Sequence, residues 1–370
     1  MLFHMVCWQV LKTDYPYATF LYYDRSVFVD FRGVLAAVNS GRPYSSDDFL
    51  MPELPPALIL VSLLGDLPHA WGHLLMTVAF LTGVFLLCQR WLSPLLPNGI
   101  LRQSAPFVIL SSYPVLTLVE RGNVEMLLFL CTTAFLTALR ASRPRPALPL
   151  LALAISMKVY PAVMLPLLIS RRLYSEAVVT AVLAFAMTCT GYALLAKWSG
   201  TTALQVLQAH AASLHQWASA STILPTLGVS HAHSLWAVYR LFFGLEHPPS
   251  VGYLAGVLIV FLGLAGWVIV VEHRLWAQVS LLAMAMLLLP YMSWDYTLIH
   301  VLIPLFLFLN KSQPSRFDLA YAVMLSLLVV PMSYYYFFAD VGLSVVVYPL
   351  LMVTLIGVLV YEGYHIYKSS

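Results

Sequence analysis

The stretch ALPLLALAISMKVYPAVMLPLLI, residues 147–169, is apolar and long enough to cross a bilayer, but Lys158 and Pro161 interrupt its middle. One continuous helix would hold a charge and a proline in lipid, and would place Arg171 and Arg172 outside. Two short helices that break between the lysine and the proline and return to the cytoplasmic side avoid these costs. Because irregular backbone at membrane depth must line a protein cavity, we predict a re-entrant hairpin with Lys158 at its tip.

The rest of the chain has the composition of a membrane protein. Hydrophobic residues make up 61% and charged residues 9% of the 370 positions, whereas about a quarter of the residues in soluble domains are charged. The mean hydropathy is +0.84, and apolar runs of about 18 to 25 residues recur along the chain. We therefore predict an all-α, polytopic integral membrane protein rather than a soluble fold or a barrel of alternating strands.

The predicted protein is a single transmembrane domain over residues 1–370, in four parts. These are a first outer loop (14–70), helices that include the hairpin (72–196), a second outer loop (197–250) and C-terminal helices (251–361). Besides the hairpin, the candidate spans are residues 72–88, 104–119, 124–139, 177–196, 251–270, 277–292, 297–309, 319–338 and 343–360.

The distribution of basic residues supports this topology. With the hairpin in place, one side collects Arg90, Arg102, Arg140, Arg143, Arg145, Arg171, Arg172, Arg274, Lys311, Arg316 and Lys368. Cytoplasmic loops are enriched in Lys and Arg, so we expect this side to be cytoplasmic. The formal charge of +3 is small and dispersed, which argues against a nucleic-acid partner. The four cysteines lack paired metal-ligand spacing, so we interpret them as buried thiols. We expect neither a metal nor a cofactor.

Ionisable and polar side chains at helix ends concentrate on the opposite, outer side. In chain order they are Asp30 and Arg32, then Glu120, Arg121 and Asn123 with Glu125 close behind, then Lys158 and Tyr160 of the hairpin, and finally Trp294, Asp295 and His300. Such groups are costly in a membrane and are functional candidates by default. We expect Arg32, Glu120, Asn123, Tyr160, Trp294, Asp295 and His300 to contact substrate.

Carboxylates and cations on one membrane face suit sugar transfer from a lipid phosphate. The departing phosphate needs cations, for which Lys158 and Arg121 are the candidates. The attacking hydroxyl needs a general base, for which Asp30 is the candidate.

Structural interpretations of the same residues remain open. Arg32 fits a solvated loop, and Glu120 with Arg121 fits an ion pair that ends a helix. Lys158 is harder to explain without function, because a lysine among apolar residues must reach the interface or bind an anion. Asp66, His69 and His73 have metal-like spacing, but interfacial histidines are more often caps.

Four stretches together resemble glycosyltransferase family 87, of the GT-C superfamily. They are Asp30-Phe31 followed by Gly41-Arg42-Pro43-Tyr44, then Arg121-Gly122-Asn123, then Met157-Lys158-Val159-Tyr160-Pro161 before Arg171-Arg172, and Leu289-Pro290-Tyr291-Met292-Ser293-Trp294-Asp295. The second and third are also similar to the eukaryotic transferase that adds the first mannose to glycosylphosphatidylinositol.

The resemblance implies a GT-C-type helix bundle and an inverting transferase that takes a sugar, foremost mannose, from a polyprenyl phosphate, with an aspartate base that corresponds to Asp30. The family's aromatic-Pro-Pro element reads Leu54-Pro55-Pro56 here, and Asp295-Tyr296 replaces histidines that often follow Ser-Trp. The family's first span precedes the aspartate, whereas residues 1–29 contain none, which leaves open a start upstream of residue 1.

The implied partners are a polyprenyl-phosphate sugar, a lipid or glycan acceptor and the bilayer, in a bacterial plasma membrane with the site on its outer face. Two alternatives remain: a transporter or flippase of a lipid-linked saccharide, and a polymerase or ligase of lipid-linked glycans. A transporter should show two related halves with matching interruptions, and the hairpin at residues 147–169 has no counterpart elsewhere in the sequence.

Overall fold

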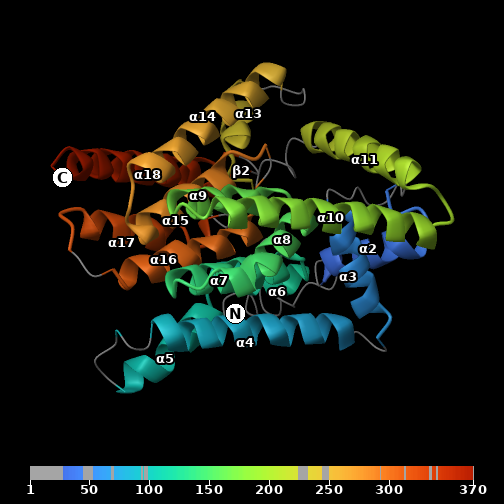
Figure 1. Ribbon diagram of the computed structural model, residues 1–370, viewed down its shortest axis with the longest axis horizontal. Helices are drawn as coiled ribbons and strands as arrows, with labels where there is room; N and C mark the ends of the chain where they lie inside the picture. The colour runs from blue at the N-terminus through green and yellow to red at the C-terminus, as the bar shows by residue number, and fades with distance from the viewer. Residues whose placement is uncertain are drawn as a thin grey trace.

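The computed structural model describes residues 28–44, 53–67, 71–92, 95, 99–223, 232–243, 250–291, 293–311, 314–332, 336–338 and 341–369. Helices dominate these residues, as Figure 1 shows. The exceptions are two short antiparallel strands, β1 (Tyr336–Phe338) and β2 (Val341–Gly342). The predicted all-α class is therefore confirmed.

Within these described ranges, four helices are long and apolar enough to cross a membrane: α4 (Trp71–Trp91), α10 (Tyr174–Trp198), α14 (Val251–Val270) and α18 (Ser344–Ser369). Their outward faces are apolar, with Phe185 of α10 and Ile259 of α14 about 70% exposed. Large apolar patches at the surface indicate contact with lipid, so the chain is a multi-pass membrane protein.

The described residues form further helices besides these four. They are α2 (Val29–Asn39), α3 (Pro55–Gly65), α5 (Gly99–Leu110), α6 (Tyr113–Arg121), α7 (Glu125–Arg140), α8 (Leu148–Met157), α9 (Pro166–Ser170), α11 (Ala203–Ile223), α13 (Leu235–Phe243), α15 (Leu275–Leu288), α16 (Leu302–Leu309) and α17 (Asp318–Leu327), with 3-10 turns η2 (Arg145–Ala147), η3 (Tyr160–Met164) and η4 (Asp295–Val301). The core lies around α15, which is buried on every side from Trp276 to Leu288.

Some helix boundaries differ from the predicted spans. Residues 104–119 do not form one helix, because Ser112 is extended (φ −70°, ψ 152°) and Pro114 lies in the first turn of the new helix α6. The last part of residues 319–338 is strand β1. The ranges predicted as outer loops, 14–70 and 197–250, contain α2 and α3, and α11 and α13, respectively.

The hairpin at residues 147–169 is present. Helix α8 ends at Met157 because Lys158 takes an extended conformation (φ −147°, ψ 136°), and Pro161 lies in the first turn of η3, where its missing N–H costs nothing. The chain then returns through η3 and α9. Arg145 before α8 and Glu176 after α9 form an ion pair of 2.9 Å, so the two ends of the hairpin lie together, as predicted.

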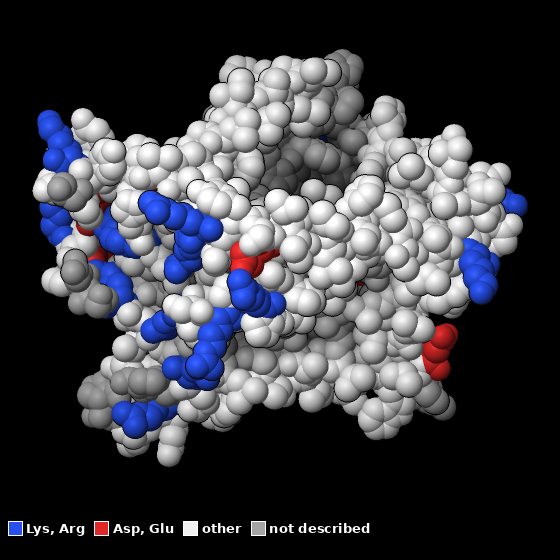
Figure 2. All heavy atoms as spheres, in the orientation of Figure 1, with Lys and Arg blue, Asp and Glu red and all other residues white. Residues whose placement is uncertain are grey.

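The basic side chains gather at one end of the molecule. Figure 2 shows Lys and Arg concentrated at the end that holds the start of α10 and the end of α7, while fewer charged side chains, of both signs, lie at the opposite end on this face. This asymmetry agrees with the sequence-based topology.

The hairpin makes a topology prediction that three matched serines test. In a cysteine-free background, Ser142→Cys and Ser175→Cys should react with an impermeant thiol reagent from one side only, because the intervening chain turns back. Ser199→Cys, at the far end of α10, should react from the other side only. If Ser142→Cys and Ser175→Cys react from opposite sides, residues 147–169 span the membrane.

Candidate active site

The first part of the site is a clamp on Asp30. Arg121 Nη2 donates to Asp30 Oδ1 at 2.8 Å, and Arg121 Nε donates to Oδ2 at 3.3 Å. Asp30 stands in the first turn of α2, and Arg121 is the last residue of α6. Both side chains remain accessible, at 20% and 39% exposure respectively. A two-point contact fixes the plane and direction of the carboxylate.

The turn between α6 and α7 makes this clamp possible. Gly122 has a left-handed φ of 65°, and a Cβ there would lie 3.0 Å from the His73 ring and 3.1 Å from Phe31. Glycine is therefore required both by the backbone conformation and by the close packing. The turn places Asn123 so that its Nδ2 donates to Asp30 Oδ2 at 2.7 Å, while its Oδ1 accepts from the Glu125 backbone N–H at 3.0 Å.

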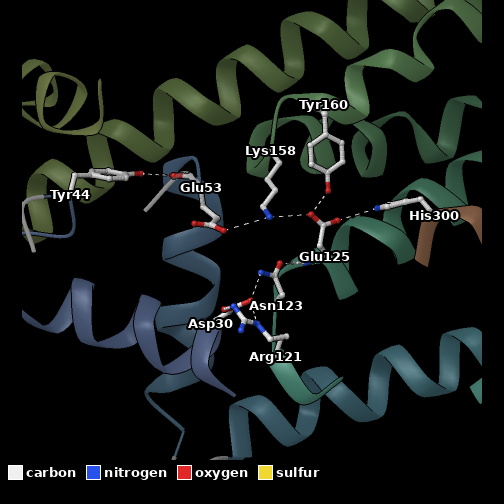
Figure 3. Close-up of polar contacts among 9 residues, drawn as sticks. All are labelled: Asp30, Tyr44, Glu53, Arg121, Asn123, Glu125, Lys158, Tyr160 and His300. Carbon is white, nitrogen blue, oxygen red and sulfur yellow. Dashed lines mark hydrogen bonds and ion pairs between the residues drawn. The ribbon is translucent and has the colours of Figure 1, made fainter. Parts of the chain in front are cut away.

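The second part of the site is centred on Glu125, which is completely buried. Lys158 Nζ donates to Glu125 Oε1 at 3.0 Å, and the Tyr160 hydroxyl donates to the same oxygen. His300 Nε2 contacts Oε2 at 3.1 Å. In Figure 3 these three residues converge on Glu125 from the hairpin and from η4. The buried charge is thus paired and hydrogen-bonded, which burial in a low dielectric requires.

Glu53 is a further acidic residue in this cluster. Its Oε1 lies 3.5 Å from Lys158 Nζ, on the side opposite Glu125 (Figure 3). The Tyr44 hydroxyl donates to the Glu53 carbonyl at 3.0 Å, and the Leu54 N–H donates to the Met157 carbonyl at 3.1 Å, so the segment before α3 is tied to the hairpin tip. Burial raises the pKa of the Glu53 carboxyl above its usual value.

Six of the predicted site residues come together in this region. They are Asp30, Arg121, Asn123, Lys158, Tyr160 and His300. Sequence reasoning assigned no role to Glu53 and none to Glu125 individually. The available signals were that Glu53 directly precedes Leu54-Pro55-Pro56 and that Glu125 follows Arg121-Gly122-Asn123.

The remaining predicted residues occupy other positions. Asp295 is buried in a neighbouring cluster, where it accepts from the Tyr113 hydroxyl at 2.5 Å and lies 3.6 Å from His233 Nδ1. The backbone of Trp294 pairs with Ala232. Glu120 is buried, and its carbonyl accepts from the Phe28 N–H at 2.6 Å. Arg32 is exposed on α2.

Among the described residues, no group of three His, Cys, Asp or Glu side chains could hold a metal ion. Of the proposed metal-like trio, His69 lies outside the described residues, and the His73 ring stacks on Phe28 with centroids 3.4 Å apart. His73 therefore has a packing role in this structure.

The pairing around Glu125 predicts a large effect on stability. Glu125→Ala should destabilise the fold by about 3 kcal/mol or more, because Lys158 loses its hydrogen-bonded partner in a buried site. Thermal unfolding in detergent measures this. Glu176→Ala is the control, since its partner Arg145 is 82% exposed and little should change. The pair Glu125→Leu and Lys158→Met should recover much of the loss, and equal sensitivity at Glu125 and Glu176 would contradict the assignment.

Comparison with known families identifies the protein's class. The model of Glycosyltransferase family 87 matches residues 54–292, more than half of the chain. This range includes Arg121, Glu125 and Lys158, and begins after Asp30. Comparisons with curated proteins and with solved structures give no match. The match includes Glu125 with its partners Lys158 and Tyr160, and its length shows that the chain belongs to glycosyltransferase family 87 as a multi-pass membrane glycosyltransferase.

Proposed function

We propose that this glycosyltransferase moves a hexose, foremost mannose, from a polyprenyl-phosphate donor to a hydroxyl of a lipid or glycan acceptor. The reaction takes place on the outer face of a bacterial plasma membrane and inverts the anomeric carbon. The observation that carries the proposal is the accessible Asp30 carboxylate, held by Arg121 and Asn123 beside the Lys158 cluster. A base and two cations are thereby available in one place, and the family supports sugar transfer.

The leaving group is the reason for the cations. When the bond between the anomeric carbon and the phosphate oxygen breaks, polyprenyl phosphate departs with an additional negative charge, which positioned cations stabilise. Arg121 is the more exposed cation, at 39%. Lys158 gives one hydrogen bond to Glu125, and the Glu53 carboxylate lies farther away, at 3.5 Å. An ammonium has three N–H donors, so Lys158 retains donors for a phosphate.

Asp30 is the proposed general base. A carboxylate has about four acceptor positions, and Arg121 and Asn123 occupy three of them, two on Oδ2 and one on Oδ1. The remaining position on Oδ1 accepts the hydroxyl of the acceptor. As that oxygen bonds to the anomeric carbon, its proton passes to Asp30.

This arrangement differs from that of a glycosidase. A glycosidase needs one carboxylic acid to protonate the leaving oxygen and a second carboxylate as nucleophile or base. A phosphate leaves without protonation, so one carboxylate is sufficient here. Direct displacement by the acceptor inverts the anomeric carbon.

The direct test is incubation of purified protein with polyprenyl-phosphate mannose and a lipid extract. We expect release of polyprenyl phosphate and a mannosylated product with the opposite anomeric configuration. Nucleotide sugars should not substitute for the donor, and turnover with a nucleotide sugar alone would overturn the proposal.

Asp30→Asn should reduce transfer by about a hundredfold or more, because the amide cannot accept the proton. Its carbonyl oxygen can still accept from Arg121 Nε and Asn123 Nδ2, whereas its NH2 cannot accept from Arg121 Nη2. Initial rates and donor binding are measured side by side. Asp66→Asn is the matched control, since this exposed residue is the C-cap of α3 and is not one of the hydrogen-bond partners of the Asp30 carboxylate, Arg121 and Asn123. Retention of more than about a tenth of the wild-type rate in Asp30→Asn would remove Asp30 from the role of base.

Lys158→Met should raise the donor Michaelis constant about tenfold or more, and Lys158→Arg should recover donor use only in part, because the planar fork differs from a compact ammonium. Lys197→Met, an exposed lysine at the end of α10, is the control. Circular dichroism separates loss of donor use from loss of fold. Unchanged kinetics in a folded Lys158→Met would show that Lys158 has only a structural role.

A further inference from the structure

We propose that Arg90 and Arg140, at the basic end of the molecule, form a binding site for a phosphate group, separate from the candidate active site. Arg90 lies in the last turn of α4, and Arg140 is the last residue of α7. Together with Trp91, Thr137 and Ala141 they line a cavity of about 270 Å³. No carboxylate is among these lining residues. Two guanidinium groups in a small cavity without a counter-charge are suited to a phosphate.

Three other basic residues at this end differ from these two, because each is paired with a carboxylate. Arg145 pairs with Glu176 at 2.9 Å, and Lys311 pairs with Asp318 at 2.6 Å. Arg274 pairs with both Glu272 and Glu362. In the part of the chain that the structure describes, neither Arg90 nor Arg140 is within ion-pair distance of an acidic group, so their charge is available to a ligand.

The ends of two neighbouring helices would normally disfavour an anion here. Carbonyl groups at a helix C-terminus carry partial negative charge. Asn310 pairs with two such carbonyls, one at the end of α4 and one near the end of α16. Its Nδ2 donates to the Trp91 carbonyl at 2.6 Å and to the Phe306 carbonyl at 2.8 Å. The Asn310 side chain therefore masks part of the negative potential of α4 and α16.

The position of Arg140 is also fixed. Its guanidinium lies over the Trp91 ring, 5.2 Å from the centroid, and its Nη2 lies 3.5 Å from Asn310 Oδ1. Stacking on an aromatic ring holds one face of a guanidinium and leaves N–H groups at its edge for a ligand. Arg140 thus has less side-chain freedom to lose on binding than an unsupported surface arginine.

The surroundings indicate where the phosphate comes from. The cavity lies at the end of α4, whose outer face exposes apolar residues such as Leu86, at 59%. Headgroup phosphates of a bilayer occupy this level at the end of a lipid-facing helix, and basic pockets between helices on the cytoplasmic side recognise anionic headgroups. The phosphate of an anionic phospholipid and free inorganic phosphate share the same recognition chemistry.

The test measures binding to the full chain in detergent, independently of sugar transfer. Phosphatidylglycerol is added and the bound lipid is counted by native mass spectrometry, with zwitterionic phosphatidylcholine as the comparison lipid. In a parallel arm, inorganic phosphate is titrated and the unfolding temperature recorded. The variant is Arg90→Gln with Arg140→Gln. Its matched control is Arg171→Gln with Arg172→Gln, which removes two charges just before the start of α10, at the same end, but none from the cavity.

We expect the Arg90 and Arg140 variant to bind phosphatidylglycerol about tenfold more weakly, while the control variant binds like wild type. Loss of a phosphate-dependent stabilisation, without loss of lipid binding, would support the site with free phosphate as its ligand. Equal behaviour of the two variants toward both probes overturns the proposal. If the double variant does not fold, Arg90→Gln alone replaces it, because Arg90 is exposed. This single variant must also weaken phosphatidylglycerol or phosphate binding if the proposal holds.

Discussion

A buried carboxylate in a membrane protein must be paired, and the pairing of Glu125 organises the site. Glu125 is inaccessible to solvent at the start of α7, where it meets Lys158, Tyr160 and His300. These partners come from two segments far apart in the chain. Removing any partner leaves charge or polar atoms without compensation in a low dielectric. The pairing therefore stabilises the fold and, at the same time, sets the position of the Lys158 ammonium group between Glu125 and Glu53.

The interruption at Lys158 has a second consequence. Because the backbone leaves the helical conformation there, the carbonyl of Met157 is free of α8 and accepts from Leu54 instead. This bond joins the segment before α3 to the hairpin tip and brings Glu53 to the far side of Lys158. A continuous helix would have used that carbonyl internally and left Glu53 without this attachment.

The sequence was sufficient to recognise residues that are energetically unfavourable in a membrane-spanning helix. It was not sufficient to predict which residues distant in the chain contact one another. The expense of Lys158 and Pro161 in an apolar run was sufficient to predict a break and a returning chain, and the structure has both. The proximity of Asp30 to Arg121, 91 positions apart, or of Tyr113 to Asp295, 182 positions apart, depends on how helices pack and has no local pattern. Glu53 lies outside the predicted apolar spans, where a charged residue is not unusual, so the sequence did not predict its burial.

Some predicted helix boundaries were wrong for a related reason. Hydropathy is insensitive to where the backbone bends, so residues 104–119 read as one span although Ser112 and Pro114 divide them. The bend positions α6 so that its last turn points Arg121 toward α2, and Gly122 then redirects the chain into α7. Arg121, which holds Asp30, and the buried Glu125 are thus only four residues apart along the chain, yet they contact different partners: Asp30 for Arg121 and Lys158 for Glu125. The left-handed turn at Gly122 separates them, which is why a compact sequence motif supplies both halves of the site.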